Sequence, residues 1–148
     1  MKIIINEVED IEDIEDIEIV INCKTIDENM SRIISKLKAL EEKITGNKDG
    51  KIFILDANEI FYFESVDKKT FIYMDKEVFE THSRLYELEE RLKNTDFFRA
   101  SKSTIINLRK VKNILPMFGG RIEILLDNGE KLVVSRQYVP ILKNKLDL

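Results

Sequence analysis

The sequence predicts a mostly β protein with short helices, α+β overall, preceded by a small strand–helix unit at the N-terminus. After residue 50, helical spacing of apolar residues gives way to short β-branched and aromatic runs. Polar turns separate these runs, and Asp127-Asn128-Gly129 is the strongest hairpin turn among them. Before residue 50, a short apolar run precedes a stretch with apolar residues at helical spacing.

The N-terminal unit is expected to contain a strand over 19–24 and a helix over 26–43. Residues 19–24 are rich in β-branched side chains, which favour strands. Thr25 and Glu28 match a capping box, in which the Thr25 side chain accepts from the Glu28 backbone amide and the Glu28 side chain accepts from the Thr25 backbone amide. The apolar face that follows comprises Met30, Ile33, Ile34, Leu37 and Leu40.

The segment 46–50, rich in glycine and polar residues, is the best candidate boundary in the chain. We therefore expect a small acidic strand–helix region over 1–46 and a second domain over 47–148. The helix over 26–43 and the strand over 19–24 could supply a surface for self-association, or the helix could cover a sheet of its own chain. The sequence leaves both alternatives open.

The second domain is expected to be built mainly from antiparallel strands. Strand candidates cover 52–55, 59–65, 70–74, 77–80, 113–118, 121–126 and 131–134, and residues 99–107 alternate weakly. A helix is expected after a cap at Thr81 or Ser83, with Leu85, Leu88 and Leu92 on one face. A last helix is expected to begin near Pro140, with Tyr138, Ile141 and Leu142 facing inward.

Composition restricts the class of protein. The 148 residues are 43% hydrophobic and 35% charged, as in soluble globular proteins. No run approaches the roughly 20 apolar residues of a membrane helix, and no signal peptide is evident, so we expect a cytoplasmic protein that is not inserted in a membrane. Cys23 and His82 are the only cysteine and histidine, so we expect neither a disulfide, nor a metal site, nor a cofactor.

Charge is distributed unevenly along the chain. Residues 1–50 hold 7 Lys or Arg against 13 Asp or Glu, whereas residues 99–148 hold 10 against 4. A polyanion would therefore be attracted to the last third of the chain. The segment 7–18 contains eight acids in twelve residues. It is either a solvated or weakly helical stretch or an interaction element that competes with DNA for the basic surface.

The sequence offers no signal for catalysis. It has no glycine-rich phosphate loop and no nucleophile elbow, and a catalytic dyad or triad would have to use His82 or Cys23. Both residues are expected to be structural, so we do not expect an enzyme. Cations and hydroxyls gather instead in 97–107 and 135–137, at strand ends where side chains can pair with phosphates or reach base edges. The alternative is that these are merely solvated strand edges.

Four motifs occur in a fixed order across the second domain. They are Ile60-Phe61-Tyr62-Phe63-Glu64-Ser65 with a Lys-rich turn and Thr70, the helix over 85–92, Phe97-x-Arg99-x-x-Lys102-Ser103-x-Ile105-Ile106-Asn107, and Val134-Ser135-Arg136-x-Tyr138. In this order and spacing, residues 50–148 resemble the LytTR DNA-binding domain of bacterial transcription regulators.

The resemblance implies an elongated body of three antiparallel sheets. It also implies that loops, rather than a recognition helix, enter successive major grooves of double-stranded DNA at tandem direct repeats. Carried over by position, the DNA-contacting residues would be Lys69, Thr70, Ser101, Lys102, Ser103, Arg136 and Gln137. The chain departs from many members at Ser101, where they have histidine, and at Thr104, where they have an aromatic residue.

The resulting expectation is a sequence-specific DNA-binding transcriptional regulator of which two copies act together, as a homodimer or paired on DNA. The roughly 45 residues before the LytTR-like part are too few for a receiver domain, so control by receiver phosphorylation is not expected. Stand-alone relatives often occur with a membrane-protein partner, and such a partner is plausible here. The alternative is a protein-interaction module that controls a partner without binding DNA, which the acidic N-terminus favours.

Overall fold

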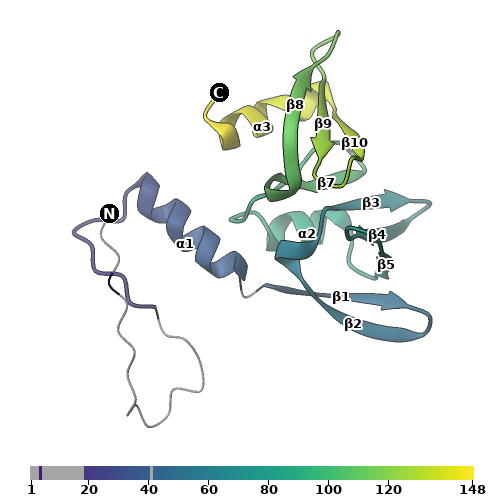
Figure 1. The fold of residues 1–148 in the computed structure, drawn as a ribbon, viewed down its shortest axis with the longest axis horizontal. Helices are drawn as coiled ribbons and strands as arrows, with labels where there is room; N and C mark the ends of the chain where they lie inside the picture. Colours follow the sequence, from purple (N-terminus) through teal and green to yellow (C-terminus); the bar gives the residue numbers. More distant parts are fainter. Residues whose placement is uncertain (1–3, 5–18, 41) are drawn as a thin grey trace.

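The computed structural model describes Ile4, residues 19–40 and residues 42–148 (Figure 1). The acidic segment 7–18 lies outside the described residues. The predicted mostly β, α+β fold is confirmed. The helices and 3-10 turns are α1 (Glu28–Leu40), η1 (Ala57–Glu59), α2 (Leu85–Arg91), η2 (Leu108–Lys110), η3 (Arg136–Tyr138) and α3 (Val139–Leu146). The strands are β1 (Lys43–Lys48), β2 (Lys51–Asp56), β3 (Tyr62–Val66), β4 (Lys69–Tyr73), β5 (Val78–Thr81), β6 (Phe97–Arg99), β7 (Thr104–Asn107), β8 (Val111–Pro116), β9 (Ile122–Leu126) and β10 (Lys131–Val134).

The strands form two antiparallel sheets rather than the three that the resemblance implies. One has seven strands in the order β2-β1-β5-β4-β3-β7-β6, and the other has three in the order β10-β9-β8. In the larger sheet, the β1–β2 hairpin joins the other strands only through the residue pair Asn47 and Glu80. Figure 1 shows the smaller sheet and α3 above the larger sheet, with α1 to one side.

The larger sheet is covered on both faces, so the molecule has two apolar cores. Along β3, Phe63 belongs to the first core, beneath α2, whereas its neighbour Tyr62 belongs to the second, beneath the smaller sheet. The same alternation places Ile105 and Ile106 of β7 in different cores. Burial on both faces explains why neighbouring residues within each of these strands are both apolar instead of alternating with polar residues.

The N-terminal prediction needs three corrections. Residues 19–24 do not form a strand and are exposed, because no neighbouring strand among the described residues pairs with them. The helix ends at Leu40, and its cap is Asp27, whose Oδ1 accepts a hydrogen bond of 2.8 Å from the Met30 amide; Thr25 is not the cap. The segment 46–50, the candidate boundary, forms the end of β1 and a hairpin turn, with Asp49 and Gly50 at positive φ.

Two details of the later helices also differ from prediction. The N-cap of α2 is Arg84 instead of Thr81 or Ser83, and the Arg84 amide donates to Glu87 Oε1 at 3.1 Å. In α3, Leu142 is fully buried as predicted, but Ile141 is 40% exposed. A helix of this length presents only a narrow stripe to the core, so adjacent residues cannot both face inward.

Helix α1 lies beside the rest of the chain without covering a sheet. Its apolar side chains Met30, Ile33, Ile34 and Leu37 are half-buried, and none of them belongs to either core. The Arg32 guanidinium pairs with Asp147 of the C-terminus at 2.9 Å. Among the described residues, no helix has the length and apolar character needed to cross a membrane.

Candidate nucleic-acid interface

The β3–β4 turn and the β6–β7 loop lie next to each other at one end of the larger sheet. Strand β3 pairs with β4 on one side and with β7 on the other, so both connections emerge at the same end. The Ser65 amide donates a hydrogen bond of 2.8 Å to the Ser103 carbonyl, which extends this pairing into the loop. The predicted contact residues Lys69 and Lys102 are therefore brought to one side of the molecule.

The segment after β10 continues the same row. The Ser135 amide donates a hydrogen bond of 2.9 Å to the Ala100 carbonyl, which precedes the β6–β7 loop. Arg136 and Gln137 follow directly, on η3, and both are exposed. We call the three segments 66–69, 101–103 and 135–137 the loop row. Backbone hydrogen bonds thus link the β6–β7 loop to the segments on either side of it.

The β3–β4 turn presents lysines to solvent. Asp67 and Lys68 have φ of 51° and 67°. Positive φ at both central residues is typical of the type I′ turn, the hairpin turn whose twist matches that of the flanking strands. Lys69 is exposed at the start of β4. Thr70, predicted as a contact residue, instead lies within the sheet opposite Ser65 and is 4% exposed, so its side chain does not reach the surface.

The β6–β7 loop is held from beneath by Arg99. The Arg99 side chain is only 14% exposed and pairs with Glu89 of α2 at 2.7 Å. Its Nε donates to the Ser101 carbonyl at 2.6 Å and its Nη2 to the Lys102 carbonyl at 2.5 Å. Because one planar guanidinium bonds both carbonyls, it fixes the loop from which the exposed Lys102 side chain projects.

The two serines of this loop bond each other. Ser101 is half-buried, and its Oγ accepts a hydrogen bond of 3.2 Å from the Ser103 amide. The two hydroxyl oxygens lie 3.4 Å apart. Ser101 thus shapes the loop, while Ser103 is exposed.

Arg136 lies against the tip of the β8–β9 hairpin. A Cβ atom on Gly120 would lie 3.3 Å from Arg136 Cγ and 3.7 Å from its Nε. Gly120 has a φ of +79°, a conformation that side chains also disfavour. The glycine therefore leaves the space that the Arg136 side chain occupies.

The exposed cations of the loop row have no carboxylate partner among the described residues. Elsewhere in the basic last third, Arg99, Arg109, Lys110 and Lys131 form ion pairs with Glu89, Asp96, Glu59 and Glu123. Lys69, Lys102 and Arg136 form none with any residue that the structure describes. Cations without an internal partner are available to phosphates or base edges.

Sequence analysis did not assign a role to Arg99, although the residue stands in the motif. The signal that could have identified it is a cation directly after a buried aromatic pair, where a charged side chain needs hydrogen-bond partners close by. The asparagine that ends the same motif is structural: Asn107 is 1% exposed and donates to the Ile60 carbonyl at 2.8 Å.

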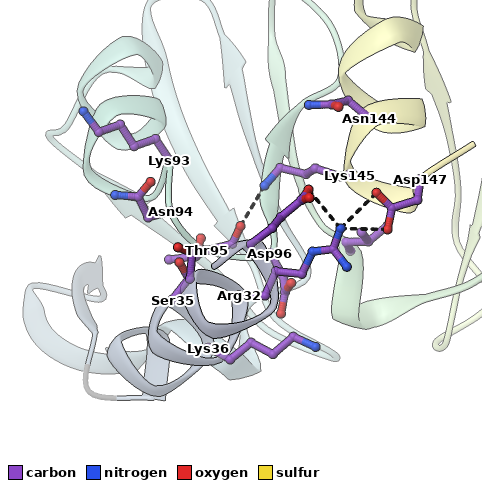
Figure 2. A pocket seen from close by; sticks show the side chains of 13 residues that line it. Arg32, Ser35, Lys36, Lys93, Asn94, Thr95, Asp96, Asn144, Lys145 and Asp147 are labelled. Atoms are coloured by element: carbon purple, nitrogen blue, oxygen red, sulfur yellow. Dashed lines mark hydrogen bonds and ion pairs between the residues drawn. The ribbon is translucent and has the colours of Figure 1, made fainter. Parts of the chain in front are cut away.

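A hollow lies apart from the loop row, between α1, the segment after α2, and α3 (Figure 2). Its volume is about 490 Å³, and charged or polar side chains line most of it. In Figure 2 Arg32 points at Asp147, and Lys145 donates to the Thr95 carbonyl at 2.8 Å. Burial lowers the pKa of the Lys145 amine. The Arg32–Asp147 pair links α1 to the C-terminal segment, and the Lys145–Thr95 bond links α3 to the segment after α2.

No metal-ligand cluster is present within the described ranges: no group of three or more His, Cys, Asp or Glu side chains is placed to hold an ion. The side chains that project from the loop row are cations, hydroxyls and one amide, which suit recognition of a polyanion with base edges.

Comparison with known proteins agrees with this geometry. Over 107 residues the chain is 30% identical to the sensory transduction protein LytT of Enterococcus faecalis, covering 72% of this chain and 44% of that protein. The chain thus spans less than half of that relative. Over 130 residues it is 28% identical to an uncharacterized HTH-type transcriptional regulator of Staphylococcus aureus, covering 86% of this chain and 88% of the relative.

A solved structure has the same fold. The LytTr DNA-binding domain of a Bacillus cereus protein, described as a methyl-accepting/DNA response regulator, superposes with a TM-score of 0.69 at 26% identity. The match covers 73% of this chain and 99% of that domain. The profile of the LytTr DNA-binding domain matches residues 50–147, which include the whole loop row. The chain therefore belongs to the LytTr DNA-binding domain family.

Proposed function

We propose that the chain is a sequence-specific regulator of transcription that binds double-stranded DNA through the loop row. The observation that carries this proposal is the continuous row of three projecting segments, joined by backbone hydrogen bonds, whose exposed cations lack internal partners. Family membership and the regulator names of the relatives support it. The contact set is Lys69, Ser101, Lys102, Ser103, Arg136 and Gln137, without the buried Thr70.

The loop row suits insertion into successive major grooves. A major groove is about 12 Å wide and admits a β-hairpin turn as well as a helix. Arg136 and Lys102 can donate to guanine O6 and N7, and the Gln137 amide can pair with adenine. Lys69, at the other end of the row, is proposed to bind phosphate. The family resemblance leads us to propose tandem direct repeats as the target.

The test is fluorescence anisotropy with duplexes from the region upstream of the coding sequence, against scrambled duplexes, at several salt concentrations. We expect tight, salt-dependent binding that favours the genuine duplex. Arg136→Ala should cost about 1–3 kcal/mol and relax preference at one base pair. Lys102→Ala should act likewise if Lys102 contacts a base, or weaken all duplexes evenly and lower the salt slope by about one if it contacts phosphate.

Lys76→Ala is the matched control. Lys76 is exposed in the β4–β5 turn, at the opposite end of β4 from the loop row, so its removal changes net charge equally without touching the interface. Equal losses of DNA affinity from Lys76→Ala and Arg136→Ala would mean that the net charge of the protein, and not a specific contact, governs binding. Absence of binding by folded protein at low salt would contradict DNA binding and favour a protein-interaction module.

We further propose that two copies act together and that the half-buried apolar residues of α1 supply the contact between them. Those side chains belong to neither core of their own chain, and tandem repeats require two copies side by side. Gel filtration with light scattering, with and without DNA, should show a species of twice the monomer mass that Ile33→Glu abolishes. A monomer under all conditions would contradict pairing. A membrane-protein partner is a further expectation, which cross-linking in cells would test.

A further inference from the structure

The tip of the β8–β9 hairpin projects an aromatic side chain beside the loop row. Phe118 is 97% exposed, and Leu115, near the end of β8, is 57% exposed. The tip is closed by a hydrogen bond of 2.9 Å from the Met117 amide to the Arg121 carbonyl, with Gly119 and Gly120 at positive φ. A single exposed aromatic is ordinary on a protein surface, so its surroundings decide what it signifies.

The Arg136 side chain of the loop row lies against this hairpin tip. The 3.3–3.7 Å spacing from a Cβ built on Gly120 to the Cγ, Cδ and Nε atoms of Arg136 places this side chain along the hairpin tip. Successive base pairs of DNA are about 3.4 Å apart. A duplex that Arg136 touches must therefore also meet the hairpin tip within a base pair or two.

The charge of the hairpin fits the same ligand. Residues 112–121 contain Lys112 and Arg121 and no acid. Arg121 is exposed and, within the described part of the chain, forms no ion pair. The nearest acid along the chain, Glu123, is held by Lys131 at 3.9 Å. A polyanion would approach this tip without repulsion.

We propose that the β8–β9 hairpin tip is a further DNA-contact element, next to the base pair that Arg136 reaches. Arg121 pairs with a phosphate, and Phe118 packs on the apolar surface of a sugar or of a thymine methyl group. This inference rests on the proposed function. It adds an apolar contact to an interface that otherwise consists of cations, hydroxyls and one amide.

The experiment measures anisotropy of the full chain with the duplex it prefers, for Phe118→Ala and Arg121→Ala. Phe118→Ala should weaken binding about tenfold and leave the salt slope unchanged, because no charge is lost. Arg121→Ala should weaken binding to all duplexes and lower the salt slope by about one. Tyr86→Ala, which removes a 70% exposed aromatic from α2, and Lys76→Ala are the matched controls and should bind like the wild type.

Shortening the duplex locates the contact. Removing base pairs from the end that faces the hairpin should weaken the wild type to the level of the double variant Phe118→Ala/Arg121→Ala and leave that double variant unchanged. If the wild type binds and both hairpin variants match it in affinity and salt slope, the inference is overturned and the proposed function stands. If the wild type binds no duplex, the result contradicts both the proposed function and this inference. Because Phe118 is almost fully exposed, its loss should leave the melting temperature unchanged, which circular dichroism verifies.

Discussion

At the residue scale, buried and partly buried polar side chains hold the strand ends and the loop row in shape from within. Asn107 donates to the Ile60 carbonyl, and its Oδ1 accepts from the Arg109 amide at 3.1 Å, so it ties the end of β7 to the chain before β3. Arg99 does the same for the loop that carries Lys102. The polar residues of the motif thus fall into two groups. Some form hydrogen bonds within the chain, and others project into solvent.

Tyr62 and Tyr73 give a prediction about pH at this scale. Their rings stack 4.3 Å apart on neighbouring strands, and burial raises the pKa of both phenols, with nearby carboxylates adding to the effect. Above pH 10, the unfolded chain loses phenol protons that the folded chain keeps, so the free energy of unfolding should fall as pH rises. Below pH 10 this contribution is fully present.

Urea unfolding at pH 9, 10 and 11 checks this. Tyr62→Phe should make the fall shallower by up to about 1.4 kcal/mol per pH unit, since one titrating group is removed. Parallel pH profiles for the variant and the wild type would contradict it.

At the scale of elements, the strands with apolar runs were predictable, and those made by tertiary contact were not. Strand β3 and the hairpin of β9 and β10 follow from side-chain pattern and turn residues. Strand β1 does not, because glycine and asparagine are poor strand formers. Strand β1 forms because it pairs with β2 along its whole length. Gly46 also allows close packing against Phe79, because a Cβ on Gly46 would lie only 2.8 Å from Phe79 Cβ.

The converse error has the same cause. Residues 19–24 have strand-forming side chains but no partner strand among the described residues, and propensity alone does not make a strand. In the candidate site, sequence located the loops, because cations at strand ends stand out. It could not show that Thr70 faces inward or that Arg99 reaches back to two carbonyls, since both depend on register and on side-chain path.

Strand β2 leads to a prediction about solubility. It is an edge strand of the larger sheet, and Ile52 and Ile54 are 74% and 76% exposed on it. Exposed apolar edges promote strand pairing between molecules. Ile54→Lys should raise the concentration at which the protein stays in solution, with a change in unfolding free energy within about 0.5 kcal/mol.

Light scattering against concentration measures this effect. Tyr86→Lys, which adds the same charge on α2, is the control. An equal gain from both variants would mean that charge, and not the strand edge, governs solubility.

At the scale of the whole molecule, the two cores are expected to unfold together. Strand β3 supplies adjacent residues to both, so neither core can lose its packing while the strand stays in place. Leu88→Ala in the first core and Leu142→Ala in the second should each cost roughly 2–5 kcal/mol and lower one shared transition.

Thermal unfolding followed by far-UV circular dichroism and by tyrosine fluorescence tests this coupling, because the stacked tyrosines involve only the second core. Coincident curves are expected for wild type and variants. Two separate transitions, each moved by only one of the substitutions, would show independent cores.

The backbone bonds that join the loop row have a consequence for how binding preference can change over time. The Ser65–Ser103 and Ser135–Ala100 bonds use only main-chain groups, which every residue except proline provides in full. Under the proposed function, substitution at Lys102 or Arg136 therefore alters which bases are favoured while the distance between the contacting positions is retained. A lineage with this scaffold can acquire new target sites by exchanging a few side chains, without rebuilding the fold that presents them.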